Sequence, residues 1–209
     1  MSQRNSNYAR KPAEFYPTPE WVTEALMKRR GWQFRTPLWE CACGDGNISK
    51  VLARYDNTGK IRATDIIYGQ DFFSFDTIGD SRSIITNPPF GSQGKDAERF
   101  IRHALELTRP VKGLVAMLLR VDFDSAKSRR DIFLDNPAWG TKLILTKRIK
   151  WFDEPVPCKK CIGKTSVERA LCKNCHGTGM TSPGPSENHA WYIWDWQRHG
   201  NPDIDYYIE

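Results

Sequence analysis

Short apolar runs alternate along this chain with stretches of helical periodicity, and this order permits few folds. Apolar runs typical of strands lie near residues 37–41, 60–66, 83–86, 113–119, 141–149 and 190–196. Helices are expected near residues 18–30, 48–55, 96–107 and 125–134. Strands that alternate with helices favour an α/β fold, in which helices cover both faces of a mostly parallel sheet. Right-handed crossovers then bring the strand ends to one edge, where ligands bind.

The first helix has a recognisable start. Thr18 offers a hydroxyl for the N-cap, Pro19 suits the first helical position and Glu20 places an acid in the first turn. We therefore expect Thr18 to cap a helix that runs to about Arg30.

Composition limits the class of protein. With 209 residues and 39% hydrophobic residues, the chain can bury the core of one domain. No apolar run reaches the roughly 18 residues of a membrane span, and the polar start lacks a secretory h-region. We expect a cytoplasmic protein without a membrane partner and with a flexible basic leader over residues 1–12. A net charge of +6 favours a polyanionic partner, although many proteins of this charge bind no nucleic acid.

A glycine turn over residues 43–47 separates the first apolar run from the next helix. Glycines let the backbone turn tightly against a ligand, and the following helix start offers free N–H groups. Ser49 occupies the last glycine position of the dinucleotide fingerprint, which disfavours a nicotinamide cofactor. Asp65, about 20 residues on, can accept from ribose hydroxyls. Asp71 and Phe72 would offer an acceptor and a flat wall to an adenine ring. Singly, each is an ordinary turn or core residue; in series they favour a nucleoside cofactor.

The apolar run 83–86 ends abruptly at Asn87-Pro88-Pro89-Phe90. Two prolines fix φ twice and remove two N–H donors, and Pro88 restrains Asn87 away from the helical region. The result is a stiff loop of acceptors beside an aromatic face, suited to a planar ring that bears an NH₂ group. Two acceptors on the amino protons would draw the nitrogen toward a tetrahedral shape and free its lone pair for attack on a methyl sulfonium. The alternative is a proline-rich turn with a buried asparagine.

These motifs, in this order, resemble those of the class I S-adenosylmethionine-dependent amino-methyltransferases of DNA, the adenine-N6 group in particular. The resemblance spans roughly residues 14–155 and 188–197 and implies a Rossmann-like three-layer sandwich with a mostly parallel seven-stranded sheet. It also implies that S-adenosylmethionine contacts Tyr16, Thr18, Glu40, Cys41, Ala42, Gly44, Asp45, Gly46, Asp65, Ile66, Asp71, Phe72 and Asn87. The catalytic residues would be Asn87, Pro88, Pro89 and Phe90.

The chain departs from the family in two places. Cys41-Ala42-Cys43 stands where many relatives have proline or phenylalanine. No insertion is large enough for an ordinary target-recognition domain, so the sequence leaves target specificity open.

Four of the six cysteines form two Cys-x-x-Cys pairs, at Cys158, Cys161, Cys172 and Cys175. Paired units of this kind are typical of structural zinc with tetrahedral sulfur ligation; redox activity is the alternative. Residues 175–179 also resemble the zinc repeats of J-domain chaperones, which we take as a similar knuckle only. Five basic residues decorate this segment and either contact phosphate or form a solvated surface: Lys159, Lys160, Lys164, Arg169 and Lys173.

The sequence therefore predicts a methyltransferase domain over residues 13–155 and 186–209, with a zinc-knuckle insert over residues 156–185. The predicted reaction is methyl transfer from S-adenosylmethionine to adenine N6 of a flipped base in DNA. The compact size favours an enzyme of a bacterial or phage-infected cell, and a monomer is slightly favoured although the sequence leaves the oligomeric state open. Two alternatives keep the chemistry on RNA adenine or on a protein glutamine amide. Two others, of a different class, are a catalytically inactive nucleic-acid-binding protein and a zinc-dependent interaction module.

Overall fold

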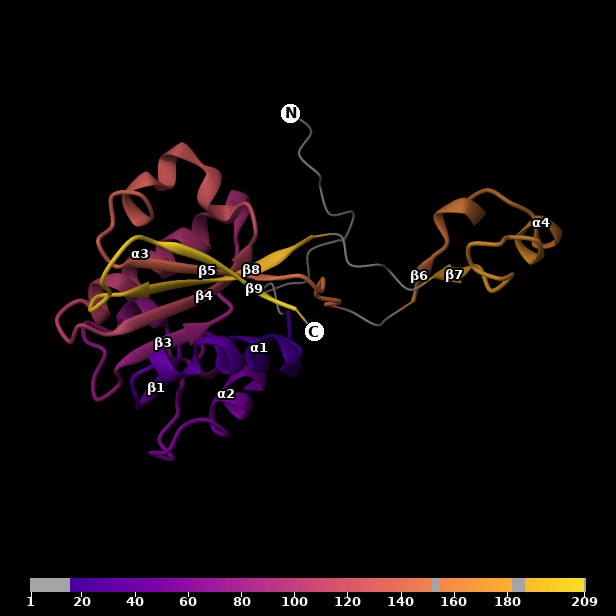
Figure 1. The fold of residues 1–209 in the computed structure, drawn as a ribbon. Helices are drawn as coiled ribbons and strands as arrows, with labels where there is room; N and C mark the ends of the chain where they lie inside the picture. Colours follow the sequence, from indigo (N-terminus) through magenta and orange to yellow (C-terminus); the bar gives the residue numbers. More distant parts are fainter. Residues whose placement is uncertain (1–15, 152–154, 182–186, 209) are drawn as a thin grey trace. The chain divides into compact units, whose positions relative to one another are not determined.

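The computed structural model describes residues 16–151, 155–181 and 187–208, and the chain forms two compact units (Figure 1). One unit contains the chain up to Ile149 and the segment from Glu187 onward; the other is Lys150–Ser186. The expected leader, residues 1–12, lies outside the described residues. Within the described ranges, no helix has the length and apolarity to cross a membrane.

The larger unit is built on a seven-stranded sheet in the order β2-β1-β3-β4-β8-β5-β9. Its strand β8 runs antiparallel to both neighbours, and every other neighbouring pair is parallel, which confirms the predicted α/β fold. The strands are β1 (Leu38–Glu40), β2 (Arg62–Ala63), β3 (Ser83–Thr86), β4 (Leu114–Arg120), β5 (Trp139–Leu145), β8 (His189–Asp195) and β9 (Asp203–Tyr207). The helices are α1 (Glu20–Arg30), α2 (Asn47–Leu52) and α3 (Lys95–Thr108).

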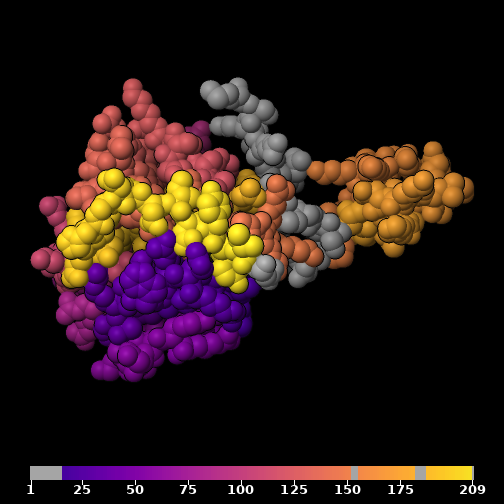
Figure 2. All heavy atoms as spheres, viewed as in Figure 1, coloured from indigo at the N-terminus to yellow at the C-terminus, as the bar shows by residue number. Residues whose placement is uncertain are grey.

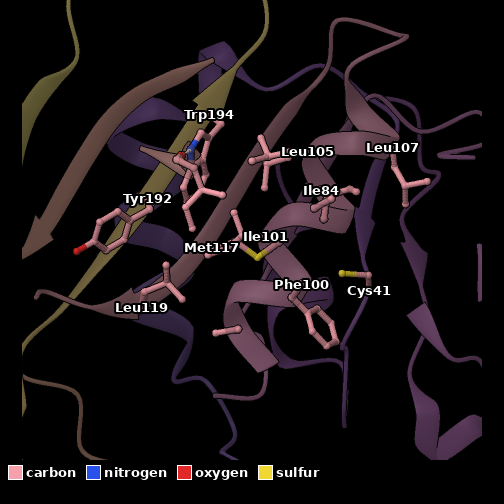
Figure 3. Packing of buried hydrophobic residues seen from close by; sticks show 14 of the residues in the cluster. Cys41, Ile84, Phe100, Ile101, Leu105, Leu107, Met117, Leu119, Tyr192 and Trp194 are labelled. Atoms are coloured by element: carbon pink, nitrogen blue, oxygen red, sulfur yellow. Dashed lines mark hydrogen bonds between the residues drawn. The ribbon is translucent and has the colours of Figure 1, made fainter. Parts of the chain in front are cut away.

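Helical segments cover both faces of the sheet, so the unit has three layers (Figure 1). Two tryptophans of β8 that are three positions apart show this, because an odd spacing along a strand points side chains to opposite faces. The Trp191 indole donates to the carbonyl of Val22 in α1 at 2.9 Å, and the Trp194 indole donates to Ile132 on the other face at 2.7 Å. Figure 3 shows the core on the α3 side, where Phe100 and Ile101 of the helix lie with Met117 of β4 among the buried residues.

The expected helix over residues 125–134 is wrong. The chain forms two 3₁₀ turns there, Phe123–Ser125 and Lys127–Ile132, separated by Ala126 in an extended conformation. A tertiary contact outweighs helix propensity, because the Arg129 guanidinium donates to the Phe123 carbonyl at 2.9 Å across the break.

The start of the first helix also differs from the prediction. Pro19 occupies the N-cap position and no side chain caps the helix. The Thr18 hydroxyl instead accepts a hydrogen bond from the Asn87 side chain at 3.1 Å. The Thr18 hydroxyl, which was expected to cap the helix locally, therefore makes a contact between two segments that are far apart in sequence.

The seventh strand, β9, lies beyond residue 196, where no apolar run in the sequence predicted a strand. β9 pairs in parallel with β5 and lies against α1, as Figure 2 also shows for the C-terminal segment. Arg29 and Arg30 at the end of α1 form ion pairs with Asp205, and Arg30 also pairs with Asp203 at 2.7 Å. These charges, more than 170 residues apart in sequence, attach the strand.

The smaller unit has little regular structure. It contains a two-stranded antiparallel sheet of β6 (Val156–Pro157) and β7 (Met180–Thr181), a short helix α4 (Ser166–Ala170) and a 3₁₀ turn over Lys159–Cys161. Its buried cluster consists of Cys158, Cys161 and Cys175, with Cys172 packed against them.

Candidate active site and metal centre

The order of the strands contains a topological switch point at the carboxyl edge of the sheet. From β1 the chain moves to β2 on one side and then to β3 on the other, so the direction of winding reverses between β1 and β3. In open α/β sheets, ligands bind at this switch point. The glycine turn follows β1, and Asn87-Pro88-Pro89-Phe90 follows β3. Two of the sequence motifs therefore flank the position at which the fold itself places a ligand.

Asp65 fastens the glycine turn to the end of β2. Its carboxylate accepts from the Gly44 N–H at 2.8 Å and from the Ile67 N–H at 3.0 Å. Gly44 and Gly46 have φ of 49° and 76°, a region that favours glycine, and a Cβ at Gly46 would meet no atom within 4 Å. Each carboxylate oxygen keeps a second lone pair. The half-buried Asp65 can therefore hold the turn and still accept from two hydroxyls of a nucleoside.

Glu40 is a buried acid that holds the other side of the glycine turn through hydrogen bonds from Ser49. It ends β1, is 1% exposed, and accepts from the backbone N–H and the hydroxyl of Ser49 in the first turn of α2. Burial raises the pKa of Glu40 to about 8, and the Ser49 hydrogen bonds oppose this shift. Ser49, at the last position of the fingerprint, therefore donates to the Glu40 carboxylate at the end of β1.

This buried acid should make stability depend on pH. Between its unfolded pKa near 4.5 and its folded pKa of about 8, the folded state holds a proton that the unfolded state releases. Stability from Glu40 is therefore full below pH 4.5, falls as pH rises toward 8, and is constant above. We expect Glu40→Gln to remove this slope, so that the variant gains on the parent by a few kcal/mol at pH 8.5 relative to pH 5. Urea unfolding of both proteins, without cofactor, measures the difference. Parallel pH profiles would contradict the assignment.

The Asn87 amide is held in one orientation by the segment before α1. Its Nδ2 donates to the Thr18 hydroxyl at 3.1 Å and to the Tyr16 carbonyl at 3.4 Å. Because the nitrogen is engaged on that side, Oδ1 lies on the opposite edge of the amide and is the atom that can accept from a ligand. Pro88 is buried, and Phe90 is half-buried against the core. The loop is thus fixed from both sides.

The other residues expected at the cofactor site differ in how far their side chains are exposed to solvent. Ile66 is 68% exposed beside Asp65, and Asp45 is exposed in the turn, whereas Ala42 is half-buried. Cys41 is 2% exposed and belongs to the core. A ligand can therefore meet the side chains of Ile66 and Asp45, but only the main chain of Cys41.

Phe72 likewise presents no ring to solvent. It is 2% exposed, stacks on Phe100 with ring centroids 5.0 Å apart and meets the edge of Trp39. His103, to which the sequence assigned no role, lies within 3.1 Å of the Phe72 carbonyl through Nε2. The exposed Asp71 accepts from the Phe73 N–H at 3.0 Å. The expected flat wall is thus a core group, and any contact with a ligand falls to Asp71 and the main chain.

The loop that follows Phe90 is tied down by Arg129, which sequence reasoning did not single out. The guanidinium donates to the Gln93 and Phe123 carbonyls, both at 2.9 Å, and lies 3.7 Å from the centre of the Phe123 ring. A Cβ at Gly94, where φ is 77°, would lie 2.8 Å from this guanidinium. Because residue 129 lies in a segment predicted as helix, no sequence signal pointed to this contact.

Arg129→Ala should loosen this loop. The change removes two donors from the Gln93 and Phe123 carbonyls, so we expect a loss of about 1–3 kcal/mol in unfolding free energy. Amide exchange of residues 92–95 should quicken. The matched control is Arg130→Ala, because Arg130 is 64% exposed and pairs only at the surface with Asp135, an interaction of about 0–1 kcal/mol. Equal effects of the two variants on exchange in this loop would argue against the contact.

The second candidate site is the cysteine cluster in the smaller unit. The four sulfur atoms lie within 4.8 Å of one another, with Cys158 and Cys172 sulfurs 3.9 Å apart and Cys161 and Cys175 sulfurs 3.5 Å apart. A tetrahedral Zn²⁺ with Zn–S bonds of about 2.3 Å has sulfur–sulfur edges of roughly 3.8 Å. The cluster thus has the dimensions of a four-thiolate zinc site.

The surroundings of the sulfurs favour the thiolate at Cys158 and Cys172 and oppose it at Cys161. Backbone N–H groups of Cys175 and Asn174 lower the pKa of Cys172 to about 6, and the Asn174 amide, 3.2 Å from the Cys158 sulfur, lowers the pKa of that thiol. Burial and the neighbouring sulfurs raise the pKa of Cys161 to about 12. The four cysteines can therefore all be ionised together only when a cation compensates their charge.

No protein-family model and no curated protein matches this chain at the level of sequence. Solved structures do resemble it. A type I restriction-modification system methyltransferase subunit from Streptococcus thermophilus has a TM-score of 0.53 at 13% identity, over 88% of this chain and 45% of that one. A protein from Listeria monocytogenes, assigned as a class I S-adenosylmethionine-dependent methyltransferase, has a TM-score of 0.52 at 10% identity, over 90% and 61%.

A third similar structure comes from Vibrio vulnificus and is assigned as a modification subunit of a type I restriction enzyme. Its TM-score is 0.52 at 12% identity, over 92% of this chain and 46% of that one. The chain thus spans about half the length of these proteins. The larger unit of this chain has the Rossmann-like fold of class I methyltransferases.

Proposed function

We propose that this protein transfers a methyl group from S-adenosylmethionine to the exocyclic N6 amino group of adenine in DNA. The observation that carries the proposal is the Asn87 amide at the switch point of the sheet, whose Nδ2 donates to Thr18 and Tyr16 and whose Oδ1 is its one acceptor. Two of the similar structures are restriction-modification subunits, which supports methyl transfer and DNA as the substrate class.

The carboxyl ends of β1 and β2 fit the cofactor. Asp65 keeps lone pairs for the ribose hydroxyls, and the open space at Gly46 lets a ligand approach the main chain. Exposed Ile66 offers an apolar face for the adenine ring, and Asp71 an acceptor for its amino group. We assign the methionine end to Tyr16 and Thr18. The remaining contacts are assigned to the main chain of Glu40, Cys41, Ala42, Gly44 and Phe72, and to the side chains of Asp45 and Asn87.

Asn87 prepares the amine for attack. When bound, the cofactor supplies a methyl group on a sulfonium. Asn87 Oδ1 and the Pro88 carbonyl accept the two amino protons and draw the nitrogen toward a tetrahedral shape, which frees its lone pair. The nitrogen attacks the methyl carbon, the carbon–sulfur bond breaks, and the cationic nitrogen then releases a proton. No strong base is required, so positioning supplies most of the rate enhancement.

The other residues of the loop position the base. Phe90 stacks on the adenine, which contributes about 1–3 kcal/mol, and Pro88 with Pro89 keeps the loop rigid. In a duplex, the adenine leaves the base stack first, at a cost of a few kcal/mol. The four cysteines of the smaller unit hold one structural Zn²⁺, which takes no part in methyl transfer.

A labelled-methyl assay tests the proposal against the alternatives. The protein is incubated with S-adenosylmethionine carrying a labelled methyl group and with duplex DNA, single-stranded DNA, RNA or a glutamine-containing protein. We expect label in DNA, recovered as N6-methyladenine after digestion. Label only in RNA or protein would replace the substrate. Cofactor binding by calorimetry without label in any acceptor would sink the assignment as an enzyme on these substrates.

A further inference from the structure

The chain leaves the larger unit and re-enters it at the carboxyl edge of the sheet, where the candidate active site lies. β5 is parallel to β4 and ends at this carboxyl edge, and β8 begins there. The insert leaves the larger unit after Ile149 and returns at Glu187. Arg148 donates to Asn188 at 2.8 Å, and Arg120 pairs with Glu187 at 3.3 Å. The points of attachment are therefore held together at the edge where Asn87 lies.

The surface of the insert is cationic. Residues 155–181 contain five basic side chains and one acid, Glu168. The Glu168 carboxylate accepts from the backbone N–H and the hydroxyl of Thr165. All five basic residues are exposed: Lys159, Lys160, Lys164, Arg169 and Lys173. Four thiolates around one Zn²⁺ add two negative charges, so the loaded insert stays positive. Such a surface attracts a polyanion.

An internal repeat places two of these lysines at equivalent positions. Cys158-Lys159-Lys160-Cys161-Ile162-Gly163 matches Cys172-Lys173-Asn174-Cys175-His176-Gly177 at both cysteines, the first lysine and the glycine. Both glycines have positive φ, 77° and 83°. Lys159 and Lys173 therefore follow the first ligand of each knuckle, where the sulfur cluster fixes the backbone.

Apolar side chains accompany the charges. Ile162, Val167 and Leu171 are 73%, 71% and 80% exposed, so the buried cluster of the insert consists of cysteines rather than of these groups. A surface that combines exposed cations with apolar side chains suits nucleic acid, whose phosphates take the cations and whose sugars and bases take apolar contacts.

We propose that the insert binds the DNA backbone through Lys159, Lys160 and Lys173. This inference rests on the proposed function for the identity of the polyanion. The insert supplies affinity for the duplex, whereas the Asn87 loop performs the chemistry.

The test replaces the three lysines with glutamine in the full-length zinc-loaded protein, and measures duplex binding as a function of salt. Three lost phosphate contacts should lower the slope of log K against log salt by about 2–3 and weaken binding about tenfold or more. The matched control replaces Lys28, Lys60 and Lys112, outside the carboxyl edge, with glutamine; it should bind as the parent does. Zinc content and thermal unfolding, unchanged in both variants, exclude a folding defect.

The outcomes separate this inference from the proposed function. Suppose that the parent methylates DNA, and that the variant with glutamine at Lys159, Lys160 and Lys173 binds duplex with the parent's affinity and salt slope. The inference then fails while the proposed function stands. If the parent methylates nothing but binds duplex through the knuckle lysines, the inference stands and the function fails. Competition by polyglutamate as strong as by duplex would indicate general attraction of polyanions and would overturn the inference.

Discussion

Replacing Asn87 with alanine should lower kcat for methyl transfer by about 10²–10³-fold, because removal of one polar group that acts on the reacting atoms costs that much in other enzymes. The side chain supplies Oδ1, one of the two acceptors on the amino group. Because Pro88, Pro89 and Phe90 remain, the base should still bind. Single-turnover methylation of a duplex substrate measures kcat, and calorimetry measures affinity for the cofactor.

A second variant, Thr18→Val, keeps the Asn87 amide but removes one contact that orients it. It therefore distinguishes the effect of the amide's orientation from the effect of its presence. Valine keeps the shape of threonine but cannot accept from Asn87 Nδ2, so the amide loses one of its two anchors. We expect an intermediate loss, about tenfold in kcat. Asn136→Ala is the control, because that side chain accepts from the Ala138 backbone in a turn far along the chain. Methyl transfer by Asn87→Ala at the parent rate would remove the basis of the proposed function.

The fold was predictable where strands and helices carry their own signal. The apolar run 83–86 became β3 with the same bounds, and the periodicity of 96–107 became α3 with one further residue at each end. Elements that depend on distant partners were not predictable. In β9, exposed Ile204 and Tyr206 alternate with two acids, so neither face of the strand has the apolar residues that would predict burial in the core. Its attachment depends on Arg29 and Arg30, which lie at the other end of the chain.

The same distinction holds for the candidate site. Proline stiffness in the loop after β3 and the position of Asp65 after β2 are local properties, so the sequence indicated both. The orientation of Asn87 depends on Thr18, 69 positions away, and the sequence had assigned that hydroxyl to a helix cap. The exposure of a ring is also a tertiary property: Phe72 follows an acid as expected, yet Phe100 and Trp39 enclose it.

Removal of zinc should unfold the smaller unit and leave the larger one folded. The described core of the insert consists of cysteines, with Ile162, Val167 and Leu171 outside it, so apolar burial contributes little to its stability. Structural zinc binds with an apparent free energy of about 10–16 kcal/mol, which is also folding free energy. We expect one zinc per chain, and loss of amide protection over residues 155–181 after treatment with a chelator. The thermal transition of the larger unit should not move, because its core is separate.

Cys172→Ser tests the ligand set without a chelator, since it leaves three thiolates and one weak ligand. Its zinc affinity should fall steeply, and protection over residues 155–181 should be lost at low zinc. Cys43→Ser is the matched control, because Cys43 is a half-buried thiol of the glycine turn and lies outside the sulfur cluster. It should keep one zinc per chain. Full protection of the insert in chelator-treated parent protein would show that contacts other than the metal hold it. In that case the sulfur cluster would be a reduced-thiol site, and the redox alternative would gain support.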